Sequence, residues 1–466
     1  MTVQEKPLAT ENVSTPNPKS KKPRNLLESK WLKGFIKSKW YPAVFQIPSV
    51  FVFGLIMYLL LLGPAEMESN FGSALTWILW WPLIPFFFLL IGRFWCAICP
   101  FATISDWVQK LVGRKKPVPK WLKKYGVWII DAFFIVVVWL DHVYGIVENP
   151  RGSGYFLASI FVGVLIAGIL FERRAWCRYL CTIGGLSGNY SRTGMLELRT
   201  DPEKCSQCKP KFCYNGSDKA PGCPVFEFPR AMDTSANCNL CGYCIKSCPN
   251  DSIRLTPRAA TSELWSIKRA KFSESFLAAV IMGIVFIQNI TMLEVWDPIL
   301  KSLEHMLGTS NYVFTFTAAY IVAILIPLGL MALFSALSSK TSREGTLKTF
   351  ARFGYAIIPL DLAGHLAHNL LHLFNEGGSL MTTFQALLGA MPMSMSMAIL
   401  PMDVITVMQY IFLAVGIFGS WYCIRKISKA NPETDSWQVR LPMNALLVIL
   451  GVINFILFYL PMMERM

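Results

Sequence analysis

Eight of the thirteen cysteines lie between residues 205 and 248, in two runs that each end in Cys-Pro. The first run reads Cys205-x2-Cys208-x4-Cys213-x9-Cys223-Pro224, and the second reads Cys238-x2-Cys241-x2-Cys244-x3-Cys248-Pro249. The second has the spacing with which bacterial ferredoxins hold [4Fe–4S] clusters: three thiolates bind one cluster and the cysteine before proline binds the other. The spacing therefore predicts two clusters, held by Cys205, Cys208, Cys213 and Cys248 and by Cys238, Cys241, Cys244 and Cys223.

Zinc is the alternative, because paired Cys-x2-Cys also suits a zinc site. A zinc site does not require three cysteines at i, i+3 and i+6 followed by Cys-Pro. This pattern therefore favours iron–sulfur clusters. Disulfide bonds would need an oxidising compartment, whereas the membrane topology derived below puts this insert in the cytoplasm.

A second set of cysteines occurs in two similar motifs. One runs from Arg93 to Pro100 (RFWCAICP) and the other from Arg174 to Cys181 (RAWCRYLC), and each follows a pair of apolar segments. The first two helical hairpins therefore look like a duplicated unit. The four thiols, Cys96, Cys99, Cys177 and Cys181, could hold a third metal centre, of iron–sulfur or copper, or form a dithiol relay. The alternative is that they are buried thiols packed against the neighbouring tryptophans.

The composition is that of an integral membrane protein. Of 466 residues, 53% are hydrophobic and only 16% are charged, and the mean hydropathy is +0.42. The net charge of +15 comes from Lys and Arg beside apolar runs, which is typical of cytoplasmic membrane flanks rather than of nucleic-acid binding. A mixed segment from Trp31 to Trp40 suits a short helix at the membrane interface.

Nine apolar segments are long enough to span a bilayer. They lie at about 42–63, 73–92, 125–141, 154–171, 274–296, 311–337, 347–374, 403–424 and 441–461. When the connections between these segments are counted from the N-terminus, the odd-numbered ones are poor in Lys and Arg and the even-numbered ones are rich in them. The positive-inside rule then predicts that the N-terminus and the cysteine-rich insert are cytoplasmic and that the C-terminus is outside.

The seventh segment carries a stripe of ionisable residues: Asp361, His365, His368 and His372 share one helix face. All are expected near the outer side, where His142 of the third span could join them. Ionisable groups inside a span mark function by default. Three interpretations compete with simple hydrogen bonding between helices. They are a quinone site, a haem b with axial histidines, and a copper site that would also use the Cu(I)-binding thioethers of Met391, Met393, Met395 and Met397.

These cysteine motifs resemble the membrane-bound polyferredoxins of the NapH/NosR/CcoG class, over about residues 45–258. In that class the paired helices end in Cys-x3-Cys-Pro and a two-cluster ferredoxin follows. This chain departs from the pattern in three places. Cys96 and Cys99 are one residue closer together, Thr182 stands where proline is usual, and the first ferredoxin run is stretched. The C-terminal membrane half lies outside the resemblance.

The expected architecture is an α-helical integral membrane protein of about nine spans with an inserted α+β two-cluster bacterial-type ferredoxin domain. The expected domains are a disordered basic tail (1–30), a four-helix membrane unit (31–195), the ferredoxin domain (196–258) and a C-terminal membrane domain (270–466). The resemblance implies a multi-pass protein of the bacterial cytoplasmic (inner) membrane.

The function that follows is iron–sulfur electron transfer between a quinone pool, or another membrane redox site, and a partner oxidoreductase, as an electron-transfer subunit. Two alternatives remain open: a copper-handling protein that uses the clusters as reductant, and a redox-sensing membrane regulator. The expected cofactors are two [4Fe–4S] clusters, with a third metal centre, quinone or haem b as additions.

Overall fold

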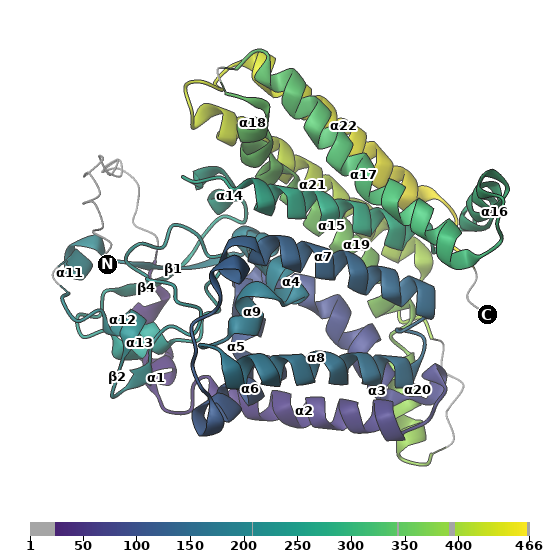
Figure 1. The fold of residues 1–466 in the computed structure, drawn as a ribbon. Helices are drawn as coiled ribbons and strands as arrows, with labels where there is room; N and C mark the ends of the chain where they lie inside the picture. The colour runs from purple at the N-terminus through teal and green to yellow at the C-terminus, as the bar shows by residue number, and fades with distance from the viewer. Residues whose placement is uncertain (1–23, 207, 343, 391–396, 464–466) are drawn as a thin grey trace.

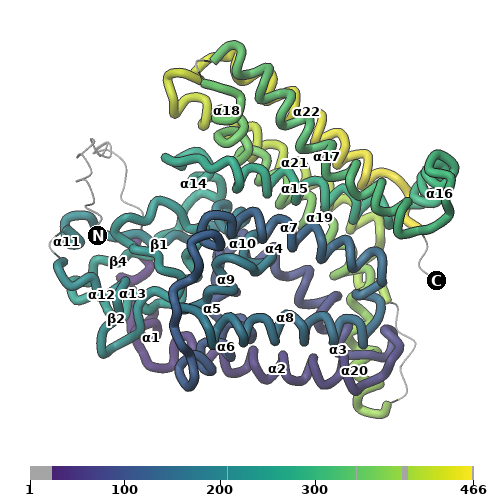
Figure 2. Tube along the Cα trace, viewed as in Figure 1, coloured from purple at the N-terminus to yellow at the C-terminus, as the bar shows by residue number. Residues whose placement is uncertain are grey.

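A computed structural model describes residues 24–206, 208–342, 344–390 and 397–463. Long helices run side by side through most of the molecule, and a small domain with short strands caps one end (Figure 1). We call this end the ferredoxin side. The opposite end, where α16 (Trp296–Leu307) and α20 (Ser379–Leu387) lie, is the far side. The N-terminal and C-terminal halves of the bundle lie side by side (Figure 2).

The N-terminal half consists of two helical hairpins. Their long elements are α2 (Ala43–Leu62), the continuous α3, π-helical η3 and α4 (Phe71–Ser73, Ala74–Trp80 and Trp81–Ile91), α7 (Lys120–Tyr144) and α8 (Pro150–Leu170). Each hairpin is followed on the ferredoxin side by short helices: η4 (Gly92–Phe94), α5 (Trp95–Ile98) and α6 (Pro100–Val112) after the first, and α9 (Ala175–Tyr179), α10 (Thr182–Tyr190) and η5 (Ser191–Thr193) after the second. Gly92 has a φ of 62°, a backbone conformation that favours glycine, and this residue ends α4.

The C-terminal half is built from α15 (Phe272–Ile290), α17 (Tyr312–Ser339), α21 (Met402–Lys429) and α22 (Trp437–Tyr459), with α19 (Ile358–Asn375) among them. Eight helices of the described residues are long and apolar enough to cross a membrane. The seventh predicted span, 347–374, is not one of these eight. It is divided into α18 (Thr346–Phe353), η6 (Gly354–Ile357) and α19, and the polar residues of α19 lower its hydropathy.

The small domain contains two short antiparallel ribbons. Strand β1 (Leu196–Thr200) pairs with β4 (Ile253–Pro257), with Leu198 opposite Leu255, and β2 (Gly216–Ser217) pairs with β3 (Ala220–Pro221). Its helices are α11 (Pro202–Ser206), α12 (Phe212–Asn215) and α13 (Tyr243–Ser247), and α14 (Ser262–Ser266) follows the last strand. These short elements leave most of the domain as loops, which carry the cysteines.

The segment before the first span packs on this domain. It contains η1 (Leu26–Glu28) and α1 (Lys30–Lys37). Leu27, Ile36 and Tyr41 are buried in one cluster with apolar residues of the ferredoxin domain, and the Tyr41 hydroxyl donates to the Leu240 carbonyl over 2.6 Å. The predicted interfacial helix thus covers a protein surface, because its buried face meets the apolar side of the domain. Residues 24–30, predicted as part of a disordered tail, belong to the same cover, and residues 1–23 lie outside the described part of the chain.

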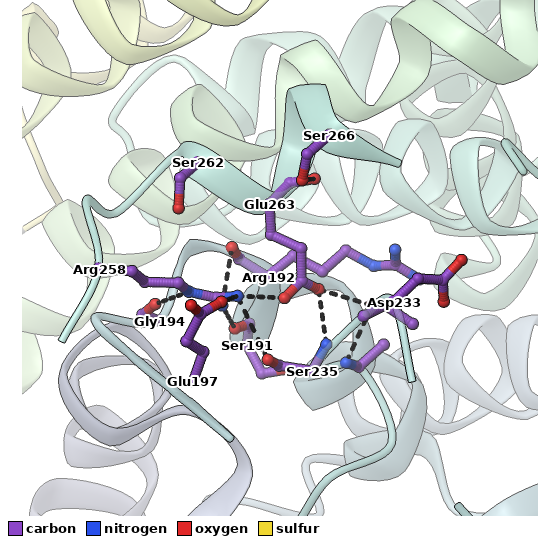
Figure 3. A network of polar contacts seen from close by, with 12 residues as sticks. Ser191, Arg192, Gly194, Glu197, Asp233, Ser235, Arg258, Ser262, Glu263 and Ser266 are labelled. Carbon is purple, nitrogen blue, oxygen red and sulfur yellow. Dashed lines mark hydrogen bonds and ion pairs between the residues drawn. The ribbon is translucent and has the colours of Figure 1, made fainter. Parts of the chain in front are cut away.

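A buried carboxylate ties the domain to the membrane bundle. Glu263 of α14 accepts hydrogen bonds from Arg258, from Arg199 and from the Thr234 hydroxyl, and Figure 3 shows it at the centre of a polar network. Close by, Arg192 of η5 pairs with Glu274 of α15 over 2.6 Å. These ion pairs hold η5, and with it the end of α10, at a defined position against the C-terminal half.

Candidate iron–sulfur centres

The cysteines of the first predicted cluster come together from three short elements. Cys205 is buried on α11, Cys213 lies on α12, and Cys248 ends α13. Burial, together with the neighbouring Cys205, Cys248 and Cys208, raises the pKa of the Cys213 thiol to about 11. The structure therefore brings together the four thiols that the sequence spacing assigns to the first cluster.

The cysteines of the second predicted cluster line one cavity. Cys223, Cys238, Cys241 and Cys244 all face it, together with Leu198, Val225 and Met232. Burial raises the pKa of Cys241 to about 12, with Cys223 and Cys238 adding to the effect. Burial raises the pKa of Cys244, and so do its three partners and Cys213 of the first group. The two groups of thiols are therefore adjacent.

Within the described ranges, no group of three or more His, Cys, Asp or Glu side chains is arranged to hold a single metal ion. A cubane cluster makes a different demand, because each of four thiolates binds its own iron at a corner of the cluster. Two adjoining groups of four thiols, one of them around a cavity, fit that demand.

The four juxtamembrane cysteines form a third group, which we call the juxtamembrane quartet. Cys96 lies on α5, Cys99 separates α5 from α6, Cys177 lies on α9, and Cys181 is the N-cap of α10. Burial raises the pKa of Cys177 to about 12, with Cys181 and Cys96 adding to it. Burial likewise raises the pKa of Cys181 to about 12, with Cys96 and Cys99 adding to it. Two hairpins thus deliver their thiols to one place.

Two buried arginines cross between the hairpins at this quartet. Arg93 of the first hairpin donates from Nε to the Cys96 sulfur over 3.4 Å and from Nη2 to the Cys177 carbonyl of the second over 3.5 Å. Arg174 of the second donates to the Cys96 carbonyl of the first over 2.5 Å. Arg174 pairs with Asp106 over 2.8 Å. Arg93 thus bonds to one sulfur, of Cys96, and to two carbonyl groups, of Cys177 and Ala236, and none of these three partners is a carboxylate.

The same arginines reach the ferredoxin domain. Arg93 donates from Nη1 to the Ala236 carbonyl over 2.7 Å, two residues before Cys238. Burial lowers the pKa of Arg174, but Asp106, Cys177 and Cys241 more than offset this, so the pKa is raised. Arg174 therefore lies near a thiol of the juxtamembrane quartet and near one of the second ferredoxin group.

Helix α10 leads from the quartet into the bundle. Its N-cap is Cys181, whose sulfur accepts from the Gly184 amide over 3.3 Å, and one turn later the Ser187 hydroxyl lies 3.7 Å from the Cys96 sulfur. At its C-terminus, the Tyr190 hydroxyl lies 3.2 Å from Nδ1 of His365 on α19. With a rise of 1.5 Å per residue, α10 carries the backbone about 13 Å from Cys181 to Tyr190.

The His stripe runs along α19 from the interior of the bundle to the far side. Ser275, near the start of α15, donates to the Ala351 carbonyl of α18. Asn289, near the end of α15, contacts His368 of α19 over 3.2 Å. Helix α15 and the segment from α18 to α19 therefore run in parallel from the ferredoxin side. Asp361 and His365 consequently lie deep in the bundle, and their expected position near the outer side of the membrane stays a prediction. Only His372 approaches the far end of α19.

Of the other predicted ligands, the structure describes His142 and Met397. His142 bonds from Nδ1 to the Val138 carbonyl of its own helix and stacks on Phe316 of α17, with ring centroids 5.2 Å apart. Met391, Met393 and Met395 lie outside the described residues, and Met397 is exposed. The positions of His142 and Met397 add no support to the haem interpretation or to the copper interpretation.

Sequence reasoning missed three residues of this arrangement. An arginine three residues before the first cysteine recurs in both motifs, and this repeat could have identified Arg93 and Arg174. Tyr190 carried no comparable signal, because its contact with His365 joins positions 175 residues apart.

A sequence profile described as a 4Fe-4S binding domain matches residues 73–119 and 153–196. These two segments contain the ends of the hairpins, with Cys96 and Cys99 in the first and Cys177 and Cys181 in the second. The match therefore falls on the juxtamembrane quartet and supports the duplication.

Several curated proteins are similar to the N-terminal half. YccM of Escherichia coli, whose name proposes a role in electron transport, is 28% identical over 224 residues, which are 42% of this chain and 60% of YccM. The ferredoxin-type protein NapH of the same organism is 28% identical over 194 residues, 38% of this chain and 66% of NapH. The methylamine utilization ferredoxin-type protein MauN of Paracoccus denitrificans is 27% identical over 141 residues, 27% of this chain and 49% of MauN. The chain thus spans less than two thirds of the length of these relatives. No solved structure matches.

Fold and motifs together define a helical membrane protein with a ferredoxin-type 4Fe-4S domain. The predicted resemblance is confirmed: over its N-terminal half the chain is similar to NapH and related membrane-bound ferredoxin-type proteins.

Proposed function

We propose that this protein carries electrons between a soluble oxidoreductase at its ferredoxin domain and a quinone in the membrane. Two [4Fe–4S] clusters would be held by the two ferredoxin groups of cysteines, and a third centre by the juxtamembrane quartet. Such clusters supply one-electron redox chemistry when bound. The observation that carries the proposal is the order of the groups: each adjoins the next, and the last is linked through α10 to a polar group inside the bundle.

The surroundings of the quartet favour an anionic centre there. A buried guanidinium is costly unless a negative charge compensates it, and Arg93 is 6% exposed with bonds to a thiol and to carbonyl groups. Four thiolates on an iron–sulfur cluster leave a net negative charge, which would compensate Arg93; Arg174 already has Asp106 as its partner. Neutral packed thiols would leave Arg93 uncompensated.

The position of Tyr190 would shorten the path between the clusters and a quinone. A quinone site at the outer surface would lie about 30 Å of hydrocarbon from the inner clusters. From Ser187, which touches Cys96, to Tyr190 the helix rises only about 4.5 Å, and the Tyr190 hydroxyl then reaches His365. A quinone headgroup at Tyr190, His365 and Asp361 would lie within electron-transfer distance of the quartet.

The Lys- and Arg-rich connections favour a cytoplasmic ferredoxin side in an inner membrane. In this orientation the donor or acceptor oxidoreductase would dock in the cytoplasm, where thiols stay reduced.

The test is to count iron and acid-labile sulfide in the anaerobically purified full chain, and to follow cluster reduction by a short-chain quinol. About twelve irons per polypeptide are expected for three cubane centres, and Tyr190→Phe should slow quinol-driven reduction while leaving the iron content unchanged. About eight irons would contradict the third centre. If a quinol cannot reduce the clusters and a quinone cannot oxidise them, the proposed quinone site is contradicted.

A further inference from the structure

Five ionisable side chains follow one another along one face of α19 and past its end. They are Asp361, His365, His368, His372 and Glu376, at spacings of four, three, four and four residues. Residues three or four apart are neighbours on a helix surface, so each group lies about one turn from the next. From first to last the row covers about 22 Å at 1.5 Å per residue.

The inner end of the row is buried and incompletely hydrogen-bonded. Asp361 is fully buried and His365 is 2% exposed. Neither carboxyl oxygen of Asp361 meets the geometry of a hydrogen bond, and Nε2 of His365 has no partner, among the described residues. The polar groups that other helices present here include the Tyr190 hydroxyl of α10 and the Trp81 ring of α4, whose centroid lies 6.3 Å from that of His365. Buried polar groups without hydrogen-bond partners raise the free energy of a membrane bundle, so their presence indicates function.

The outer end of the row reaches the surface through consecutive contacts. His368 contacts the Asn289 amide oxygen from Nδ1, and its ring centroid lies 4.9 Å from that of His372. Nδ1 of His372 lies 3.0 Å from a carboxylate oxygen of Glu376. The side chains of His372 and Glu376 are 17% and 16% exposed. Histidine can take up a proton on one ring nitrogen and release it from the other, so these contacts suit proton transfer.

We propose that this row conducts protons between Asp361 and the far side of the membrane. The proposal rests on the proposed function, because the protons would come from the quinol that supplies the electrons. Oxidation of a quinol to a quinone releases two electrons and two protons. The electrons would leave toward the quartet on the ferredoxin side, and the protons would leave through His368, His372 and Glu376 on the far side. Electron transfer would then move charge across the membrane.

The test follows the buried carboxyl itself and needs neither iron nor quinone. In infrared spectra of the full chain in lipid, a carboxylic C=O band that is absent from Asp361→Asn would report Asp361. On transfer to D2O the band should shift rapidly in the wild type. The shift should be at least ten-fold slower in His372→Ala and in Glu376→Gln, and added imidazole should restore the rate in His372→Ala.

His305→Gln is the matched control, because His305 is an exposed histidine of α16 at the same end of the molecule and outside the row. It should leave the shift unchanged. The proposal is overturned if no Asp361 band exists, if the row variants exchange as fast as wild type, or if imidazole fails to restore His372→Ala. Since exchange is measured without turnover, these outcomes are distinct from a failure of quinol to reduce the clusters.

Discussion

The ferredoxin cysteines and the juxtamembrane cysteines are assembled in different ways. The eight ferredoxin cysteines come from one stretch of 44 residues, from Cys205 to Cys248, and their loops bring them together locally. The juxtamembrane quartet takes two thiols from each of two hairpins, with Cys96 and Cys177 separated by 81 positions. Its geometry exists only when the helices have packed. A site of the first kind can be recognised from spacing alone, whereas a site of the second kind depends on the whole bundle.

The surroundings differ as well. The second ferredoxin group lines a cavity with apolar neighbours such as Leu198 and Met232, while the quartet is held by buried arginines that cross from one hairpin to the other. Charge near a cluster shifts its reduction potential. The quartet is therefore the site at which the protein fold, rather than the cysteine motif, would tune electron transfer.

The largest expected effect comes from removing one thiol of each hairpin. Cys96→Ala combined with Cys177→Ala should abolish electron exchange between the membrane site and the ferredoxin domain, because the quartet loses two of its four thiols. The ferredoxin signals in EPR of the dithionite-reduced protein should remain. Cys423→Ala, which changes a buried cysteine of α21 outside all three groups, is the control. Unchanged quinol-driven reduction in the double variant would contradict a role for the quartet.

A smaller effect is expected from Arg93→Gln. Removing one positive charge beside the quartet should destabilise its reduced form by on the order of 3 kcal/mol at an effective dielectric constant of about 20, which lowers a one-electron midpoint potential by roughly 130 mV. An EPR-monitored redox titration measures this shift.

Arg178→Gln is the matched variant for Arg93→Gln. Arg178 follows Cys177 directly, but its guanidinium pairs with Glu172 and with the Tyr179 hydroxyl. Its replacement should leave the potential unchanged. Equal shifts in both variants would mean that general surface charge, and not the buried arginine, sets the potential.

The smallest effect concerns the anchoring of the ferredoxin domain. Burial raises the pKa of Glu263, but Arg258 and Thr234 lower it by more, so its pKa lies below the ordinary value. A carboxyl whose folded pKa is depressed contributes stability above its unfolded pKa, of about 4.3, and this stability is lost as the pH falls through the folded value. Anchoring should therefore be constant between about pH 5 and 8 and weaken only in stronger acid.

Hydrogen–deuterium exchange of residues 259–266 measures this anchoring. Glu263→Gln should exchange faster at neutral pH, because Arg258 loses its buried partner, and should show no further weakening in acid beyond the intrinsic pH dependence. An acid-induced change of equal size in this variant would show that another group controls the anchoring.

Much of the fold was accessible from the sequence because local patterns specify it. The apolar runs predict the membrane helices, and eight of them match helices of sufficient length and hydropathy. The division of segment 347–374 at Gly354–Ile357 was not predicted, because its apolar composition conceals the break between α18 and α19. The docking of α1 was also missed, since an amphipathic helix with an exposed Trp31 suits a lipid surface as well as a protein surface.

The sequence by itself determined the local chemistry: which cysteines stand close along the chain, which segments are apolar, and which ionisable residues share a face of one helix. Tertiary structure alone decided how deep Asp361 and His365 lie, that Arg93 and Arg174 reach across the hairpins, and that Tyr190 contacts His365. The physical reason is that spacing along a chain fixes positions within one loop or helix. Contacts between elements depend on the packing of many side chains at once, and no single motif encodes them.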